Sequence, residues 1–243
     1  MKLKALLFTF IFAMSLEAHF LTLLPETDVV SKKQKYSFEA SFIHPFEQTG
    51  MTMEKPKRVV LFKNSKREDL KIKEIKKFNH KAWKGEFELK LPGDYIIYVD
   101  PKEYFEPAEG KFIRHITKTV INGYGMEDGW DTPANLQVEI IPLVKPYGLY
   151  KGNTFTGQVL HHEKPAANVE VEVELYNDKG LKAPTDAHIT QVVKTDSNGV
   201  FSFTMPHSGW WGFAALIEEG EIQHSDGIMY PVEVGGLIWV KAY

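Results

Sequence analysis

The sequence has no cysteine among its 243 residues. Disulfide bonds are therefore excluded, and each domain of an exported chain must be held together by its own apolar core. Thiolate metal sites and cysteine nucleophiles are excluded as well. Any metal that this chain binds must be held by nitrogen, oxygen or thioether sulfur.

Long apolar runs and clusters of basic residues are missing from most of the chain. After residue 18, charges interrupt every stretch that approaches the roughly 18 to 20 apolar residues of a membrane helix. The formal net charge is −3, and no basic stripe stands out. The sequence therefore predicts neither an integral membrane segment in the mature chain nor a nucleic-acid partner.

The N-terminus has the pattern of a secretory signal peptide. Lys2 and Lys4 precede an almost wholly apolar run over residues 5–14, which is too short to span a bilayer. Ala18 is the small residue expected before a cleavage site, although Leu16 departs from the usual pattern two positions earlier. We predict a signal peptide over residues 1–18 and a soluble, periplasmic mature chain that begins at His19.

Alternation of apolar and polar residues dominates the rest of the chain. Tyr36, Phe38, Ala40 and Phe42 share one face of an expected strand, and polar residues lie between them. Residues 59–62, 87–91, 95–99 and 112–121 continue this pattern. Turn residues interrupt it every ten positions or so, and no long amphipathic helix stands out. The sequence predicts an all-β protein built from short antiparallel strands.

A domain boundary is expected near residues 142–152, where a Pro- and Gly-containing segment breaks the alternation. Beyond it, the strand pattern restarts and includes an Asn198-Gly199 turn signal. This second half resembles the transthyretin-like or carboxypeptidase-regulatory sandwich. We therefore predict two β-sandwich domains in tandem, Ig-like or transthyretin-like, over residues 19–144 and 145–243, with metal binding in the first.

His19 is the first residue of the predicted mature chain. A free N-terminal histidine offers its α-amine and its ring Nδ1 to the same metal ion. The unperturbed pKa of an α-amine is near 8, so coordination displaces a proton and makes the affinity pH-dependent. Leu21 holds the third mature position, where some terminal metal motifs carry histidine, so only the first-residue chelate is open to this chain.

Three further histidines lie in the same half of the chain. His44 continues the apolar face of the strand that contains Phe42, His115 lies mid-strand on the face of Ile113, and His80 lies in a polar turn. Each histidine taken alone is more typical of a core or surface residue than of a ligand. Their occurrence together with His19 favours a metal site.

The expected coordination follows from these donors. His19 supplies two nitrogens, His44 and His115 bring the set to four, and His80 extends it or supports another ligand. Neutral imidazole binds Ni, Co, Cu and Zn, so the ligand types do not name the metal.

The other candidate donors are assigned to packing or to the surface. Met51 and Met53 are interpreted as apolar packing under a loop. His161 and His162 would point to opposite faces if they lie in a strand, so they are expected at the surface and not in one site. The remaining three, His188, His207 and His224, are placed in turns of the second domain.

Several segments together resemble the NikK-type periplasmic components of nickel and cobalt uptake systems. These segments are SFIHPFE at 41–47, GMTMEKP at 50–56, HKAWK at 80–84, PGDY at 92–95, YFEPAE at 104–109, DGWD at 128–131 and SGWWGFAAL at 208–216. The resemblance spans nearly the whole mature chain. It implies capture of Ni(II) or Co(II) for a membrane transporter of the energy-coupling-factor type, without enzymatic activity. Matching the segments implies His19, His44, His80 and His115 as the metal ligands.

Two other functions stay open at this point. An N-terminal histidine with one further histidine is also the copper site of lytic polysaccharide monooxygenases, which predicts Cu(II) binding and oxygen chemistry. A metal-free structural or adhesive pair of sandwiches is the third interpretation. Failure of signal cleavage would favour the third function, and oxygen- or peroxide-dependent turnover with copper would favour the second.

Overall fold

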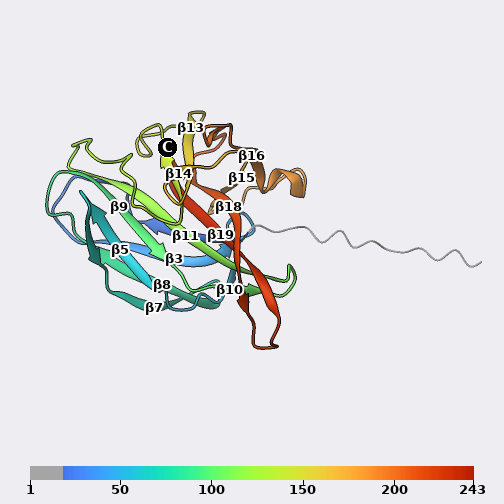
Figure 1. The fold of residues 1–243 in the computed structure, drawn as a ribbon. Helices are drawn as coiled ribbons and strands as arrows, with labels where there is room; N and C mark the ends of the chain where they lie inside the picture. The colour runs from blue at the N-terminus through green and yellow to red at the C-terminus, as the bar shows by residue number, and fades with distance from the viewer. Residues whose placement is uncertain (1–18) are drawn as a thin grey trace, which may run out of the picture.

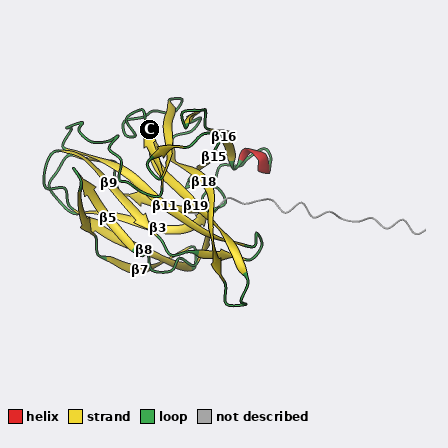
Figure 2. Ribbon diagram, viewed as in Figure 1, coloured by secondary structure: helices red, strands yellow, loops and turns green. Residues whose placement is uncertain are grey.

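The computed structural model describes residues 19–243. The predicted signal peptide, residues 1–18, lies outside the described residues. No helix within the described range is long and apolar enough to cross a membrane. One short 3-10 helix, η1 (Asp186–His188), is the single helical element among these residues, and strands make up almost all the remaining regular structure (Figure 2).

The predicted all-β class is confirmed. The first sheet has five strands in the order β1-β3-β8-β7, with β4 paired to β3. Every pairing within it is antiparallel. Its strands are β1 (Phe20–Pro25), β3 (Tyr36–His44), β4 (Thr49–Met51), β7 (Ile72–Lys77) and β8 (His80–Phe87). The alternating residues from Tyr36 to Phe42 lie in β3, as the sequence predicts.

The central sheet has ten strands and draws them from both halves of the chain. Its order is β16-β15-β18-β19-β11-β9-β5-β6, and β2 and β10 pair with β11. β11 runs parallel to β19 and to β2, and all the other pairings are antiparallel. From the N-terminal half come β2 (Val29–Val30), β5 (Arg58–Lys63), β6 (Lys66–Asp69), β9 (Gly93–Asp100), β10 (Tyr104–Glu106) and β11 (Lys111–Gly123). From the C-terminal half come β15 (Glu170–Leu175), β16 (Gln191–Lys194), β18 (Gly209–Gln223) and β19 (Met229–Ala242).

The third sheet has four strands and packs on the opposite face of the central sheet from the first sheet. It contains β12 (Val138–Pro142), β13 (Thr154–His161), β14 (Lys164–Pro165) and β17 (Val200–Thr204). Figure 1 shows β13 and β14 on one side of β11 and β19, and β7 and β8 on the other. The molecule is thus two β-sandwiches that share the central sheet.

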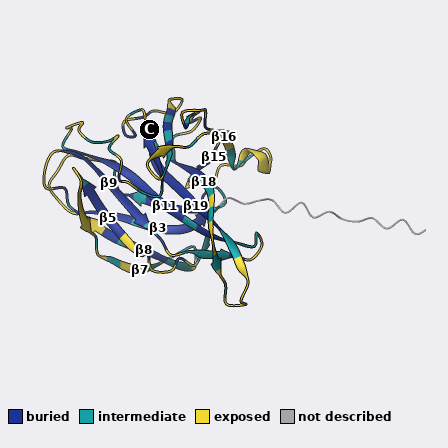
Figure 3. Ribbon diagram, in the orientation of Figure 1, coloured by how far each residue is buried: buried dark blue, intermediate teal, exposed yellow. Residues whose placement is uncertain are grey.

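Alternation along the central strands sends side chains into two separate cores. In β11, Phe112 and Ile116 join the core under the third sheet, whereas Ile113 and Ile121 join the core under the first sheet. The buried residues gather along these strands, and the loops and hairpin tips are exposed (Figure 3). His115 has the same parity as Ile113, so it faces the first sheet.

The predicted boundary at residues 144 and 145 falls in the connection between β12 and β13. β12 precedes that connection and pairs with β13 after it. Because β11 also pairs with β19, strands from both halves are hydrogen-bonded in two of the three sheets. Whether the two halves fold as separate domains stays a prediction.

Trp239 is the largest fully buried side chain and joins the central sheet to β1. Its Nε1 donates a hydrogen bond to the backbone oxygen of Leu21 at 3.0 Å. We expect Trp239→Phe to lower the free energy of unfolding by about 1–3 kcal/mol, because it removes this donor and leaves a buried carbonyl unpaired. Urea unfolding followed by circular dichroism tests this. Trp210→Phe, at a half-buried position, is the control and should change stability by less than about 0.5 kcal/mol.

Candidate metal site

His19 and His44 are brought together by the pairing of β1 with β3. Phe20 pairs with Ile43, so the next positions outward, His19 and His44, lie opposite each other at the end of the first sheet. Their ring centroids are 4.6 Å apart. Both side chains are largely shielded from solvent, since the side chain of His19 is 11% exposed and His44 is 9% exposed. The two histidines therefore lie at one rim of the sandwich.

His115 approaches this rim from the central sheet. The ring of Phe42 contacts both His19, at 5.6 Å between centroids, and His115, at 6.1 Å. His115 is 3% exposed and lines a cavity of about 40 Å³ together with Phe42, Met53 and Tyr104. That volume exceeds what a single water molecule needs. Met53 is buried there in the apolar core, and Met51, the last residue of β4, packs against the same core.

The hydrogen bonding of His115 has the form found in metal-ligating histidines. Its Nε2 lies 3.3 Å from Glu233 Oε1, which is a hydrogen bond when Nε2 carries the proton. Nδ1 then carries a lone pair, and among the described residues this buried atom has no hydrogen-bond partner. A carboxylate that holds one imidazole nitrogen commonly fixes the tautomer and orients the other nitrogen toward a metal.

Carboxylates surround His19 as well. Its Nε2 lies 3.1 Å from Glu106 Oε2, and its Nδ1 lies 3.7 Å from Glu109 Oε1. Lys111 lies between two carboxylates, with Nζ 2.6 Å from Glu109 and 2.5 Å from Glu233. The rim therefore offers imidazole nitrogen and carboxylate oxygen side by side, with one lysine that balances part of the negative charge.

Burial controls the electrostatics of this rim. Burial, followed by the electrostatic influence of His44 and His115, lowers the pKa of His19 to about 3, although Glu233 opposes the shift. Burial also opposes ionisation of Glu233, but the hydrogen bond from His115 and its electrostatic influence, followed by those of Lys111, lower its pKa to about 2. His19 is therefore neutral and Glu233 is charged near pH 7, which are the forms that bind or support a metal.

The four predicted ligands are not all brought together. His80 is the first residue of β8, and its Nδ1 lies 3.5 Å from Thr52 Oγ1. Among the described ring contacts and hydrogen bonds, none joins His80 to the other three histidines. Within residues 19–243, only one group of three or more His, Asp or Glu residues has ligand atoms that all lie within 4.8 Å of one another. That group contains none of these four histidines. His19, His44 and His115 share a rim, and coordination of one ion would require their rings to turn.

A family model described as "Domain of unknown function (DUF4198)" matches residues 16–219. The chain belongs to this family. No curated protein matches it. The match includes His19, His44, His80 and His115 but ends before β19, so Glu233 lies outside the matched part of this DUF4198 chain.

Solved structures resemble the DUF4198 chain only distantly. The D0–D1 domain of intimin is 13% identical, with 90% of this chain and 99% of that chain covered and a TM-score of 0.25. The Yersinia pseudotuberculosis adhesin InvE is 14% identical, with 88% and 58% covered and a TM-score of 0.27. A DUF4785 family protein from Legionella pneumophila is 11% identical, with 81% and 52% covered and a TM-score of 0.35. The DUF4198 chain thus spans little more than half the length of the last two.

Sequence reasoning missed the carboxylates of the rim. Glu106 and Glu109 lie in a segment that contributes to the family resemblance, but nothing in their local pattern marks them as neighbours of His19. Glu233 lies in the half of the DUF4198 chain where no metal ligand was expected. Its alternation with Leu237 and Trp239 places it on an inward face, which is the one local signal available.

The loop that follows His44 is held by the C-terminal half of the chain. Phe46 N donates to Glu174 Oε2 at 3.3 Å, and Asn177 Nδ2 donates to Phe46 O at 3.1 Å. Thr190 also donates to Glu174. Glu174 is therefore a buried carboxyl group that anchors the rim of the candidate site.

Burial, opposed by the hydrogen bond from Thr190, raises the pKa of Glu174 to about 8. A carboxyl group whose pKa is raised on folding contributes stability below its unfolded pKa, near 4.5, and loses it as the pH rises toward 8. We therefore expect the free energy of unfolding to fall between pH 5 and pH 8, with a slope of at most about 1.4 kcal/mol per pH unit from this group. Urea unfolding as a function of pH measures this. Glu174→Gln should flatten the profile, and an unchanged profile in that variant would assign the dependence to other groups.

The expectation that His161 and His162 do not share a site is wrong, although both lie at the surface. His161 ends β13, and His162 lies in the following turn rather than in the strand, with a φ of 46°. Their ring centroids are 4.5 Å apart, and both rings bond to Glu219. The alternation rule holds only within a strand, and here the strand ends between the two residues.

Proposed function

We propose that this protein binds Ni(II) or Co(II) outside the cytoplasm as cargo and passes the ion to a membrane transporter, as the NikK-type resemblance implies. The observation that carries the proposal is His115. Its Nε2 is engaged by Glu233, while its buried Nδ1 has no hydrogen-bond partner among the described residues. Leaving a buried polar atom unpaired costs about 1–3 kcal/mol, and a bound metal ion would remove that cost.

The donor types around His115 support a divalent ion of the first transition series. His19 and His44 supply further imidazole nitrogens at the same rim, and Glu106 and Glu109 supply carboxylate oxygens next to His19. Nitrogen and oxygen donors suit Ni(II), Co(II) and Zn(II), whereas soft sulfur donors select Cu(I). The site residues would capture the ion by coordination alone, without any chemical conversion.

Release is favoured by the position of His19. It immediately precedes β1, so it is held by the strand on one side only. After signal cleavage, its α-amine and ring could leave the ion without disturbing the sheets, and a ligand of the transporter could take their place. His115, fixed in the central sheet, would hold the ion until last.

Copper binding is the second candidate, and one observation favours it. A copper brace needs only the N-terminal histidine and one more, and the rings of His19 and His44 are 4.6 Å apart. The two functions differ in their need for His115. His115→Ala should weaken Ni(II) binding by at least about 10-fold and leave a His19–His44 copper brace unchanged.

The deciding experiment is calorimetric titration of Ni(II), Co(II), Cu(II) and Zn(II) into two preparations. One begins at His19, as verified by intact mass, and the other carries one additional alanine before His19. We expect one tightly bound Ni(II) or Co(II) at the rim of the first preparation and at least about 10-fold weaker binding of that ion to the second, because the extra residue converts the chelating amine into an amide. Equal affinity and stoichiometry in both preparations would show that the N-terminal amine is not a ligand, and binding by neither would favour the metal-free structural function.

A further inference from the structure

A second group of metal-binding side chains lies away from the rim, on the side of the third sheet. His161 Nε2 lies 2.9 Å from Glu219 Oε2, and His162 Nε2 lies 2.7 Å from Glu219 Oε1. The three ligand atoms lie within 4.8 Å of one another. Each oxygen of one carboxylate therefore faces a different imidazole.

The backbone explains why neighbouring histidines converge. β13 and β14 pair up to His161 and Lys164, so His162 and Glu163 form a two-residue turn. Both turn residues have positive φ, 46° and 64°. These left-handed values are the ones that a two-residue type I′ turn requires, although residues other than glycine seldom adopt them elsewhere. Here this turn brings the ring of His162 beside that of His161.

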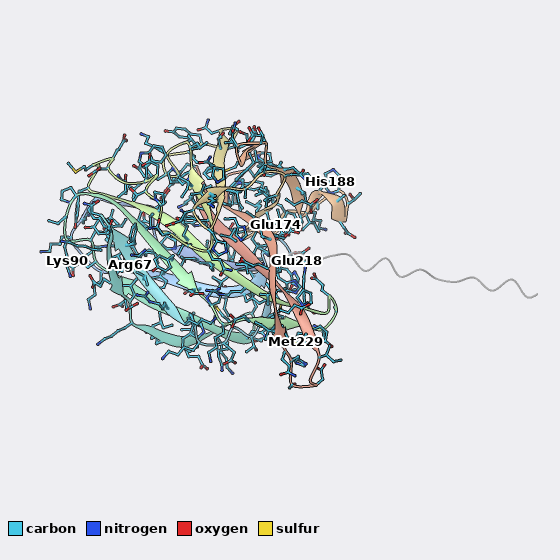
Figure 4. The ribbon with its side chains drawn as sticks, viewed as in Figure 1. Arg67, Lys90, Glu174, His188, Glu218 and Met229 are labelled. Carbon is cyan, nitrogen blue, oxygen red and sulfur yellow. The ribbon has the colours of Figure 1, made fainter. Side chains whose placement is uncertain are left out.

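Glu219 reaches this turn because its own strand is irregular. The register of β18 against β19 shifts between Glu218 and Glu221, so Glu219 lies in a bulge of the long hairpin. Figure 4 labels Glu218, the preceding residue, and Met229 at the start of β19 on the same hairpin. Bulges commonly redirect a side chain, and this one directs Glu219 toward the two histidines.

Gln137 and Arg114 form a chain of hydrogen bonds that ends at the carboxylate of Glu219. Gln137 Nε2 donates to Glu219 Oε2 at 2.7 Å, and Gln137 Oε1 accepts from Arg114 Nη1 at 2.8 Å. Arg114 is itself paired with Asp100. This chain fixes the direction of the Gln137 amide, and outer hydrogen bonds of this kind orient the carboxylates that bind metals.

We propose that His161, His162 and Glu219 form a second binding site, for a divalent ion of the nickel, cobalt, copper and zinc series. Two imidazoles and one carboxylate supply three protein donors, and water would fill the other positions because the side chains are 31%, 58% and 33% exposed. Bonds from the ion to the three side chains would replace the hydrogen bonds that His161 and His162 now make with Glu219. This site is independent of His19, His44 and His115 and does not rest on the function proposed above.

The test is titration of Zn(II) and Ni(II) into the mature chain and into His162→Ala, Glu219→Gln and His188→Ala. His188 is the matched control, since it is an exposed histidine of the same half that bonds to Thr185. We expect the first two variants to lose one bound ion or to bind it at least 10-fold more weakly, and His188→Ala to match the parent. The preparation with an additional alanine before His19 should keep this ion, which separates the two sites. Equal stoichiometry and affinity in all the variants would overturn the proposal.

Discussion

Replacing Gly235 with alanine is expected to weaken Ni(II) or Co(II) binding at the rim by at least about 10-fold. A Cβ atom at this position would lie 2.5 Å from Cδ2 and 3.1 Å from Cγ of His115, closer than the packed ring allows. Gly235 is the partner of His115 in the parallel pairing of β11 with β19. The imidazole would have to turn away, which would break its bond to Glu233 and move Nδ1. Calorimetric titration of the mature variant measures the loss.

Gly212→Ala is the matched control for this prediction. A Cβ at Gly212 would lie 2.7 Å from Cζ2 of Trp239, on the same face of the same sheet. Overpacking of this kind typically costs about 1–3 kcal/mol, so both variants should lose stability in urea unfolding. Only Gly235→Ala should lose metal affinity. Equal affinity in the two variants would show that His115 is not a ligand.

Local pattern was enough to predict the strand that carries His44 and the face on which it lies. Alternation from Tyr36 to Phe42 reflects the two-residue repeat of a strand, and His44 has the same parity as Phe42 in that strand. The same parity places His115 with Ile113. These predictions succeed because a half-buried strand records its orientation in its own sequence.

The arrangement around His115 could not be predicted in this way. β11 and β19 pair in parallel, and Glu233 is 118 positions from His115 along the chain. A parallel pair needs a long connection, here the whole third sheet and β15 to β18, and nothing in either strand specifies the partner. The sequence therefore shows that Glu233 faces inward but not which histidine it meets.

The second group was missed for a different reason. Period-two alternation assigns His161 and His162 to opposite faces only if both lie in β13, and the strand ends at His161. The turn has no glycine, so the usual composition signal for left-handed residues is missing. The position of Glu219 depends on a bulge, which shifts the parity of β18 and which no local pattern announces.

Removing the charge of Lys118 is expected to destabilise the fold by about 3–5 kcal/mol. Lys118 and Glu139 are 1% and 2% exposed, and Nζ lies 2.6 Å from Oε1 in the core under the third sheet. Glu139 also accepts hydrogen bonds from Ala134 N at 2.9 Å and Leu136 N at 3.3 Å. Lys118→Met keeps most of the side-chain volume but leaves a buried carboxylate that only neutral donors stabilise. Urea unfolding at pH 7 measures the difference.

The double variant Lys118→Met with Glu139→Gln separates the ion pair from packing. It removes both charges and retains one amide oxygen, which replaces the Glu139 oxygen that accepts from Ala134 N or the one that accepts from Leu136 N, but not both. We therefore expect it to lose less stability than the sum of the two single variants. Breaking a buried pair is costly mainly because the remaining charge is left without compensation. If the two single losses simply add, the charges do not interact, and the contribution of Lys118 is that of its aliphatic chain. The β11 strand that carries Lys118 on one face carries His115 on the other, so a metal titration of Lys118→Met also reports whether the two faces are coupled.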